Sequence, residues 1–147
     1  SDSRKDFCNS KLFPNAKNHY NATVDAFFDL VSASELKKYS DVLLLGHDWS
    51  EDEHRLLELL NICQSNTFLP NGKQFPRIGV IGSRSKWQAF SKKALNHGIS
   101  QQLLDDVICP IGLNIGAHSP EEIAVAVAGQ ILSLQRNVSP SDKTWRD

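Results

Sequence analysis

The sequence predicts an α/β domain built on a mostly parallel sheet. Asp41–Asp48 and Arg77–Gly82 each contain a short, continuous apolar run bounded by turn-forming residues. Runs of this length and pattern are typical of strands that are buried on both faces. An amphipathic helix pattern follows each run, and strands that alternate with helices indicate βαβ units, whose strands pair in parallel.

Composition limits the classes of partner and compartment. The 147 residues suffice for one ordinary domain with a real core, and a formal net charge of −1 gives no sign of a nucleic-acid partner. The apolar runs are far shorter than a membrane span, and no signal-peptide pattern is present. Three widely spaced cysteines, Cys8, Cys63 and Cys109, suggest neither a disulfide framework nor a zinc finger, and an odd number fits a reducing, cytoplasmic setting.

The first forty residues predict loops and short helices. Residues 1–23 are polar and rich in turn formers, so we expect a loop with a short helix around Phe7 and a weak strand near His19–Val24. The apolar spacing over Val24–Tyr39 suits one or two short amphipathic helices, with Ser32 or Ser34 as a cap.

Serine residues mark the expected starts of the central helices, and a loop is expected over Gln64–Pro76. We expect one helix opened by a capping box at Ser50, one over Trp87–His97 capped by Ser83 and closed by Gly98, and one from Ser100 through Ile108.

The strongest helix signal lies near the C-terminus. Ser119 is an expected N-cap, Pro120 falls at the first helical position, and Glu122 can reach back to the cap. The body, Ile123–Leu132, is apolar on nearly every face and is therefore expected to be buried on most sides. Gly129 inside it suggests a close packing contact. We expect one domain over residues 1–136, followed by a flexible polar tail over 137–147.

Two sequence blocks resemble a known family. Ile78–Lys86 reads IGVIGSRSK, and Pro110–Val125 reads PIGLNIGAHSPEEIAV. Together they resemble the C-terminal Rossmann-like domain of the XdhC/CoxI family, accessory proteins of molybdenum hydroxylases such as xanthine dehydrogenase. Gly46-His47-Asp48 is similar to a Thr-His-Asp segment of that family, and Asp2-Ser3-Arg4 to its Asp-Asp-Arg segment.

The chain departs from the family pattern in ways that bear on assembly. It lacks a first strand and the glycine-rich turn that precede the Asp2 segment in such proteins, and Asn114 replaces their usual Asp. We therefore expect a fragment of a longer protein. Strands without neighbours leave open backbone edges, so we also expect a homodimer or a larger assembly.

The resemblance implies a binding function and no catalytic turnover. Such proteins hold the molybdenum cofactor (molybdopterin) and pass it to the apo form of a molybdenum hydroxylase. Two alternatives stay open. One is a nicotinamide-dependent oxidoreductase of Rossmann type, which would need the absent glycine-rich turn. The other is a structural or interaction domain without a ligand.

Candidate ligand residues follow the two predicted strands. Gly82, Ser83, Arg84 and Lys86 open a helix, whose free N–H groups and positive dipole suit a phosphate, although an ordinary turn with solvated cations has the same sequence. His47 and Asp48 end the other strand, and ligands of open α/β sheets bind at that edge. The alternative is that they only cap and brace the turn.

Further candidates lie outside these two turns. Gly112, Asn114 and Gly116 shape the loop before the last helix and are assigned to cofactor binding, although the glycines can serve backbone geometry alone. Cys109 could carry sulfur or meet molybdenum as a thiolate, or be an inert buried thiol. Asp2 stands where a Rossmann acid would meet a ribose.

Overall fold

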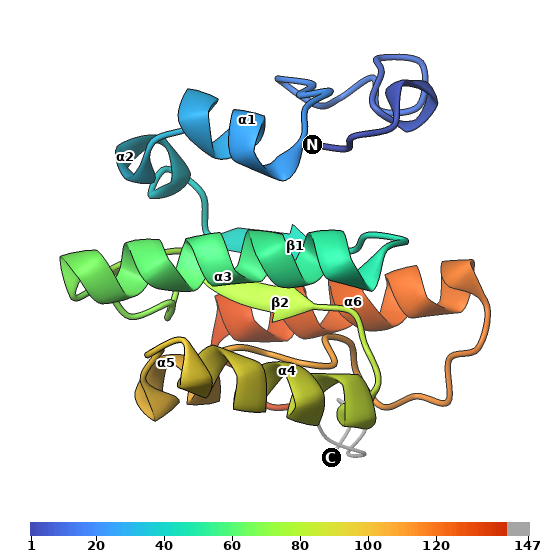
Figure 1. The fold of residues 1–147 in the computed structure, drawn as a ribbon. Helices are drawn as coiled ribbons and strands as arrows, with labels where there is room; N and C mark the ends of the chain where they lie inside the picture. The colour runs from blue at the N-terminus through green and yellow to red at the C-terminus, as the bar shows by residue number, and fades with distance from the viewer. Residues whose placement is uncertain (141–147) are drawn as a thin grey trace. The chain divides into compact units, whose positions relative to one another are not determined.

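Two parallel strands form the centre of the fold. In the computed structural model, which describes residues 1–140 (Figure 1), β1 (Asp41–Leu44) pairs with β2 (Arg77–Val80). The register joins Asp41 to Arg77 and Leu44 to Val80. The two strong strands and their parallel pairing are confirmed, and with the helices around them they make the predicted Rossmann-like α/β class. Residues 141–147 of the predicted tail lie outside the described residues.

The chain divides into two units, Ser1–Cys109 and Pro110–Asp147. The first unit holds the sheet and most of the helices: a short 3-10 helix (Lys5–Phe7), α1 (Val24–Leu30), α2 (Ala33–Leu36), α3 (Trp49–Asn66), α4 (Arg84–Asn96) and α5 (Gln101–Asp105). The second unit holds α6 (Pro120–Arg136). Over residues 1–140, no helix has both the length and the apolar character needed to cross a membrane.

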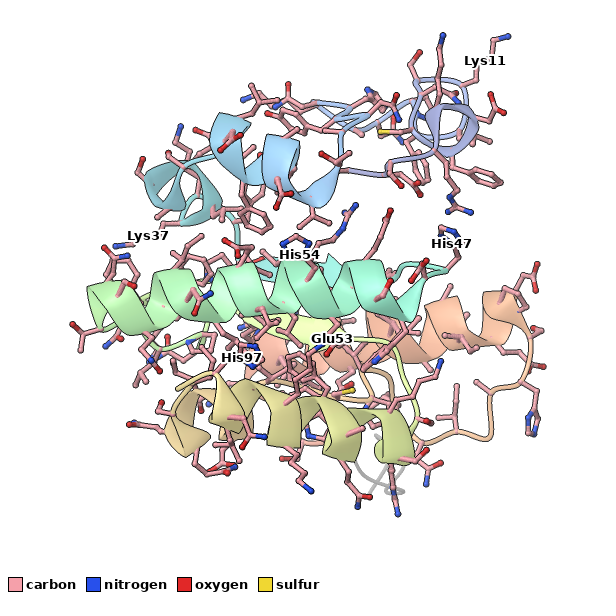
Figure 2. All side chains as sticks on the ribbon, in the orientation of Figure 1. Lys11, Lys37, His47, Glu53, His54 and His97 are labelled. Carbon is pink, nitrogen blue, oxygen red and sulfur yellow. The ribbon has the colours of Figure 1, made fainter. Side chains whose placement is uncertain are left out.

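The helices α3 and α4 lie side by side in the first unit. Glu53 of α3 forms an ion pair with Lys93 of α4, with 2.8 Å between Oε1 and Nζ. The rings of Trp49 in α3 and Phe90 in α4 meet edge to face, with their centroids 6.4 Å apart. On the other side of α3, His54 Nε2 lies 3.2 Å from Asp25 Oδ1 of α1. Figure 2 shows Glu53 on the side of α3 toward α4 and His54 on the side toward α1.

The core of this unit lies between α3, α4 and the strands. Its central side chains are fully or almost fully buried: Leu56, Leu59, Leu60, Cys63, Ile78, Val80 and Phe90. Ile78 and Val80 belong to a strand that the sequence predicts to be buried on both faces. Burial of this kind is the main favourable term in folding, at roughly 1.5–3 kcal/mol for each fully buried large side chain.

A third extended segment continues the sheet beyond β2 by one bridge. Ile108 donates to the carbonyl of Ile78 at 2.9 Å, and Val80 donates to the carbonyl of Ile108 at 2.9 Å. The short helix expected from Ser100 through Ile108 therefore ends early, because Ile108 is taken into the sheet. α5 closes at Asp105, and Ser100 caps it as expected.

Several predicted boundaries were wrong. No strand forms near His19–Val24 among the described residues; a single bridge joins Asp2 to Asn21, and α1 begins at Val24. α3 runs on to Asn66, into the expected loop, and α4 begins directly after its Ser83 cap instead of at Trp87. These differences lie at element ends, where local signals are weakest.

The expected capping box at Ser50 was wrong as well. Asp48 caps α3 instead, accepting from the backbone N–H of Ser50 at 2.8 Å and of Glu51 at 3.4 Å. Glu53, the residue that would complete a capping box at Ser50, forms an ion pair with Lys93 instead.

In the second unit, the capping box of α6 is confirmed. Ser119 accepts from Glu122 N–H at 3.2 Å, and the Glu122 carboxylate accepts from Ser119 N–H at 3.0 Å. The contact predicted at Gly129 is confirmed too, because a Cβ there would lie 3.0 Å from Leu113 Cδ1.

The prediction that Ile123–Leu132 is buried on most sides was wrong. Ala126 and Val127 are buried, whereas Val125 is 65% and Leu132 53% exposed. An apolar pattern shows which residues favour burial, but tertiary packing decides which of them are covered.

Core burial predicts a large difference between two leucine substitutions. Leu60 is 0% exposed and Leu30 is 70% exposed. Leu60→Ala should lower the free energy of unfolding by ~2–5 kcal/mol through lost burial and a residual cavity. Leu30→Ala should change it by no more than about 0.5 kcal/mol. Urea unfolding followed by circular dichroism measures both, and equal costs would contradict the assignment of the core.

Candidate functional site

The two strands end at the same edge of the sheet. Because Leu44 is paired with Val80, the segments that follow, Leu45–Asp48 and Ile81–Ser83, leave the sheet at the same level. Each leads directly into a helix. In open α/β sheets this carboxyl edge is where ligands bind.

Asp52 braces the turn after β1 from the first turn of α3. Its Oδ2 accepts from the backbone N–H of Gly46 at 2.8 Å, and its side chain is buried in the protein. A Cβ on Gly46 would collide with the Asp52 carboxylate, so a larger residue here would displace that side chain. Burial raises the pKa of Asp52, and the Gly46 hydrogen bond acts in the opposite direction. No sequence motif had marked this residue.

The side chains of His47 and Asp48 differ in how accessible they are to a ligand. Asp48 is occupied as the cap of α3, and hydrogen bonds from the Ser50 hydroxyl and backbone lower its pKa. His47 is exposed, and Figure 2 shows its side chain standing off the loop between β1 and α3. Of the two, His47 is the group that a ligand could reach without competing with a helix cap.

The turn after β2 opens α4 with exposed cations. Ser83 accepts from Lys86 N–H at 3.3 Å and so caps the helix. Arg84 and Lys86 are exposed, and α4 has no acidic residue in its first turn. The free N–H groups and the dipole of this helix end favour an anion, and the two cations add to that potential.

Trp49 joins the two turns. A Cβ on Gly82 would lie 2.9 Å from Cζ3 of the Trp49 ring and 3.7 Å from Cys109 Sγ. Lys86 Nζ stands 5.6 Å from the centroid of the same ring, within the range of a cation–π contact. The ring therefore links the starts of α3 and α4. In the sequence, the position of Trp49 directly after Gly46-His47-Asp48 is the feature that could have indicated this role.

Cys109 lies beside this contact but is not prepared as a nucleophile. Burial raises its pKa to about 11, and burial raises that of Cys63 to about 12. The thiol form therefore dominates at neutral pH. Among the described residues, no group of three or more His, Cys, Asp or Glu side chains is arranged to hold a metal ion.

Asp2 is engaged by Arg4. The guanidinium donates from Nε to Oδ1 at 3.0 Å and from Nη2 to Oδ2 at 2.9 Å. These bonds, with a backbone bond from Arg4, lower the pKa of Asp2 to about 2. A ribose at Asp2 would have to share the carboxylate with this ion pair.

A cavity of about 150 Å³ lies beside the β1 turn. Its polar lining comes from Ser1, Asp2, His47, Glu51, Asp52 and Arg55, and Leu43, Leu44, Leu45 and Gly46 complete the wall. No local motif marked Glu51, Asp52 or Arg55, because tertiary contacts bring them to the strand end.

The remaining candidates, Gly112, Asn114 and Gly116, belong to the second unit. Gly112 has φ +123° and donates to Gln130 Oε1 at 2.6 Å, and Gly116 has φ +72°. Both angles favour glycine, so backbone geometry alone explains these two residues. Asn114 is exposed on the same loop. Their assignment to cofactor binding stays a prediction.

The fold and the geometry of the sheet edge define the structural class of this domain. A parallel sheet whose strands end in glycine-containing turns that open helices is a Rossmann-like α/β domain with a ligand edge. The sequence matches the family described as the XdhC Rossmann domain over residues 1–131. The chain belongs to this family.

Known proteins agree with that assignment over a part of their length. The uncharacterized protein YqeB of Escherichia coli K12 is 26% identical over 137 residues, which cover 93% of this chain and 23% of that protein. A Bacillus subtilis protein described as a probable subunit of xanthine dehydrogenase is 28% identical over 142 residues, 95% of this chain and 36% of that protein. The chain thus spans well under half the length of these relatives.

A solved structure supports the fold. The crystal structure of a xanthine dehydrogenase from Bacillus halodurans matches with a TM-score of 0.61 and 24% identity, over 97% of this chain and 36% of that one. Together with the family match, it confirms the predicted resemblance.

The brace at the β1 turn predicts a coupled pair of substitutions. Gly46→Ala should destabilise the fold by ~1–3 kcal/mol, because its methyl group collides with the Asp52 carboxylate. Asp52→Ala removes the colliding group, so the double variant should lose less than the sum of the single losses. Urea unfolding of the three variants measures this coupling. Additive losses would contradict the brace.

The buried thiol predicts slow modification of Cys109. With a pKa of about 11, about one thiol in ten thousand is ionised at pH 7. Iodoacetamide at pH 8 should therefore label Cys109 much more slowly in the folded chain than in urea, as read by peptide mass spectrometry. Equal rates in the two states would show an activated thiolate and contradict this assignment.

Proposed function

We propose that this chain is part of a molybdenum cofactor chaperone that assists the maturation of a molybdenum hydroxylase such as xanthine dehydrogenase. The observation that carries the proposal is the family match over residues 1–131. The Bacillus subtilis relative, whose name refers to xanthine dehydrogenase, supports the connection to that enzyme. The proposal assigns binding and transfer to the chain, and no catalytic turnover.

The carboxyl edge of the sheet supports a binding role. Molybdopterin joins a pterin ring to a phosphate, so its holder needs an anion site and polar groups for the ring. The start of α4, with Arg84 and Lys86 exposed, supplies the first kind of site. His47 after β1 supplies an exposed hydrogen-bonding group at the same edge. Ser83 and Gly82 hold the α4 turn in place.

Delivery to an apo-hydroxylase would need a surface that the partner recognises. The exposed apolar side chains of α6, Val125 and Leu132, are suited to such a contact. The same feature favours the second candidate function, an interaction domain without a ligand. A cofactor titration separates the two.

The chaperone proposal predicts stoichiometric retention of cofactor. Purified chain is titrated with molybdopterin-type cofactor without oxygen, passed over gel filtration and analysed for metal. One equivalent should elute with the protein, and light scattering on the same column tests the expected homodimer or larger assembly. Elution without cofactor would contradict the chaperone role and favour the interaction domain.

A matched pair of variants locates the anion site. Arg84→Ala should weaken cofactor binding about fivefold, the effect of one lost charge-assisted hydrogen bond at an exposed site. Lys92→Ala removes another exposed cation of α4, roughly 12 Å further along the helix, and should leave the affinity unchanged. Equal effects of the two would move the phosphate away from the start of α4.

A further inference from the structure

The cavity beside the β1 turn contains an incompletely bonded cation. Arg55 lines the cavity, and its side chain is only 10% exposed. Its Nη1 donates to Ser1 Oγ at 2.9 Å, and its Nη2 donates to Glu51 Oε2 at 3.4 Å. Within residues 1–140, its buried Nε has no hydrogen-bond acceptor. A buried donor without a partner costs free energy, so an acceptor that reaches Nε would be stabilising.

Two of the three carboxylates around the cavity are paired with arginines. Glu51 faces Arg55 and also accepts from Ser3 Oγ at 2.7 Å. Asp2 is paired with Arg4. A free anion would meet three carboxylates in the wall, those of Asp2, Glu51 and Asp52, and no metal-binding group exists among the described residues. The setting therefore favours a neutral, polar occupant over a free ion.

Size and donor–acceptor pattern narrow the class of occupant. A volume of about 150 Å³ corresponds to about five water molecules or one small bicyclic ring. Asp52 supplies a carboxyl group, with Oδ2 held by Gly46, and Arg55 supplies N–H donors. Leu43 and Leu44 add apolar wall.

We propose that this cavity binds the edge of a planar heterocycle that presents a ring carbonyl beside N–H groups, as a pterin does. Arg55 donates to the carbonyl oxygen, and a carboxyl oxygen of Asp52 accepts from the ring N–H. The assignment of the ring to a pterin rests on the proposed chaperone function. It adds two residues, Arg55 and Asp52, to the binding edge and separates the ring from the anion site at α4.

Two pteridines test the role of the carbonyl. Pterin carries a ring carbonyl and an adjacent ring N–H where 2,4-diaminopteridine carries an amino group and an unprotonated ring nitrogen. Fluorescence titration of the chain should show that pterin binds at least tenfold more tightly, because Arg55 can donate to a carbonyl but not to an amino group. No pterin binding, equal binding, or tighter binding of the diamino compound would overturn the proposal.

Substitution of Arg55 provides a second test of the proposal. Arg55→Met keeps much of the side-chain length without donors, and it should weaken pterin binding about tenfold or more and remove the preference between the two compounds. Lys92→Ala is the control and should bind both as the unmodified chain does. Circular dichroism checks that Arg55→Met is folded. If this variant does not fold, the comparison of the two pteridines on the unmodified chain tests whether the cavity recognises the ring carbonyl.

The outcomes separate this inference from the chaperone role. Retention of whole cofactor that is unaffected by Arg55→Met would overturn the cavity assignment and leave the chaperone role standing. A pterin preference that depends on Arg55, without retention of whole cofactor, would support the cavity and contradict the chaperone role.

Discussion

The in-register parallel pairing of β1 with β2 is the constraint on which the other features depend. Leu44 and Val80 are partners at the ends of the two strands, so both turns leave the sheet at the same level. The pairing also sets α3 and α4 side by side, where Glu53 and Lys93 form an ion pair. A shift of register by one residue would turn the buried side chains of a strand to the opposite face and separate the turns.

Two contacts convert this edge into a defined surface. Asp52 holds the β1 turn through Gly46 N–H, and the Trp49 ring closes against Gly82 in the β2 turn. A side chain at either glycine would displace one of these contacts. The edge is therefore held by packing, which agrees with a site that binds a ligand in one orientation.

The two proposed subsites, the start of α4 and the cavity beside the β1 turn, would bind a ligand through different interactions. Exposed cations and a helix dipole at the start of α4 attract an anion through long-range potential that salt weakens. Arg55 and Asp52 in the cavity wall are themselves largely removed from water, so their hydrogen bonds depend on shape and on the matching of donors with acceptors. A ligand with a neutral ring and a charged tail is complementary to such a division.

Local signals predicted the elements well, and tertiary contacts explain what they missed. The strands, the Ser83 cap and the capping box at Ser119 depend on neighbours within a few residues, and the sequence was enough for them. The sequence did not reveal Asp52, Arg55 or the role of Trp49, because their partners become visible only in the folded chain. The exposure of Val125 on α6 was missed for the same reason.

Hydrogen–deuterium exchange with and without molybdopterin-type cofactor tests the central claim most directly, because it locates the ligand on the chain. We expect slower exchange on cofactor binding in the two turns at the carboxyl edge, residues 44–48 and 82–86, with other parts of the sheet unchanged. Protection confined to other segments, or no protection anywhere, would contradict the assignment of this edge as the binding site.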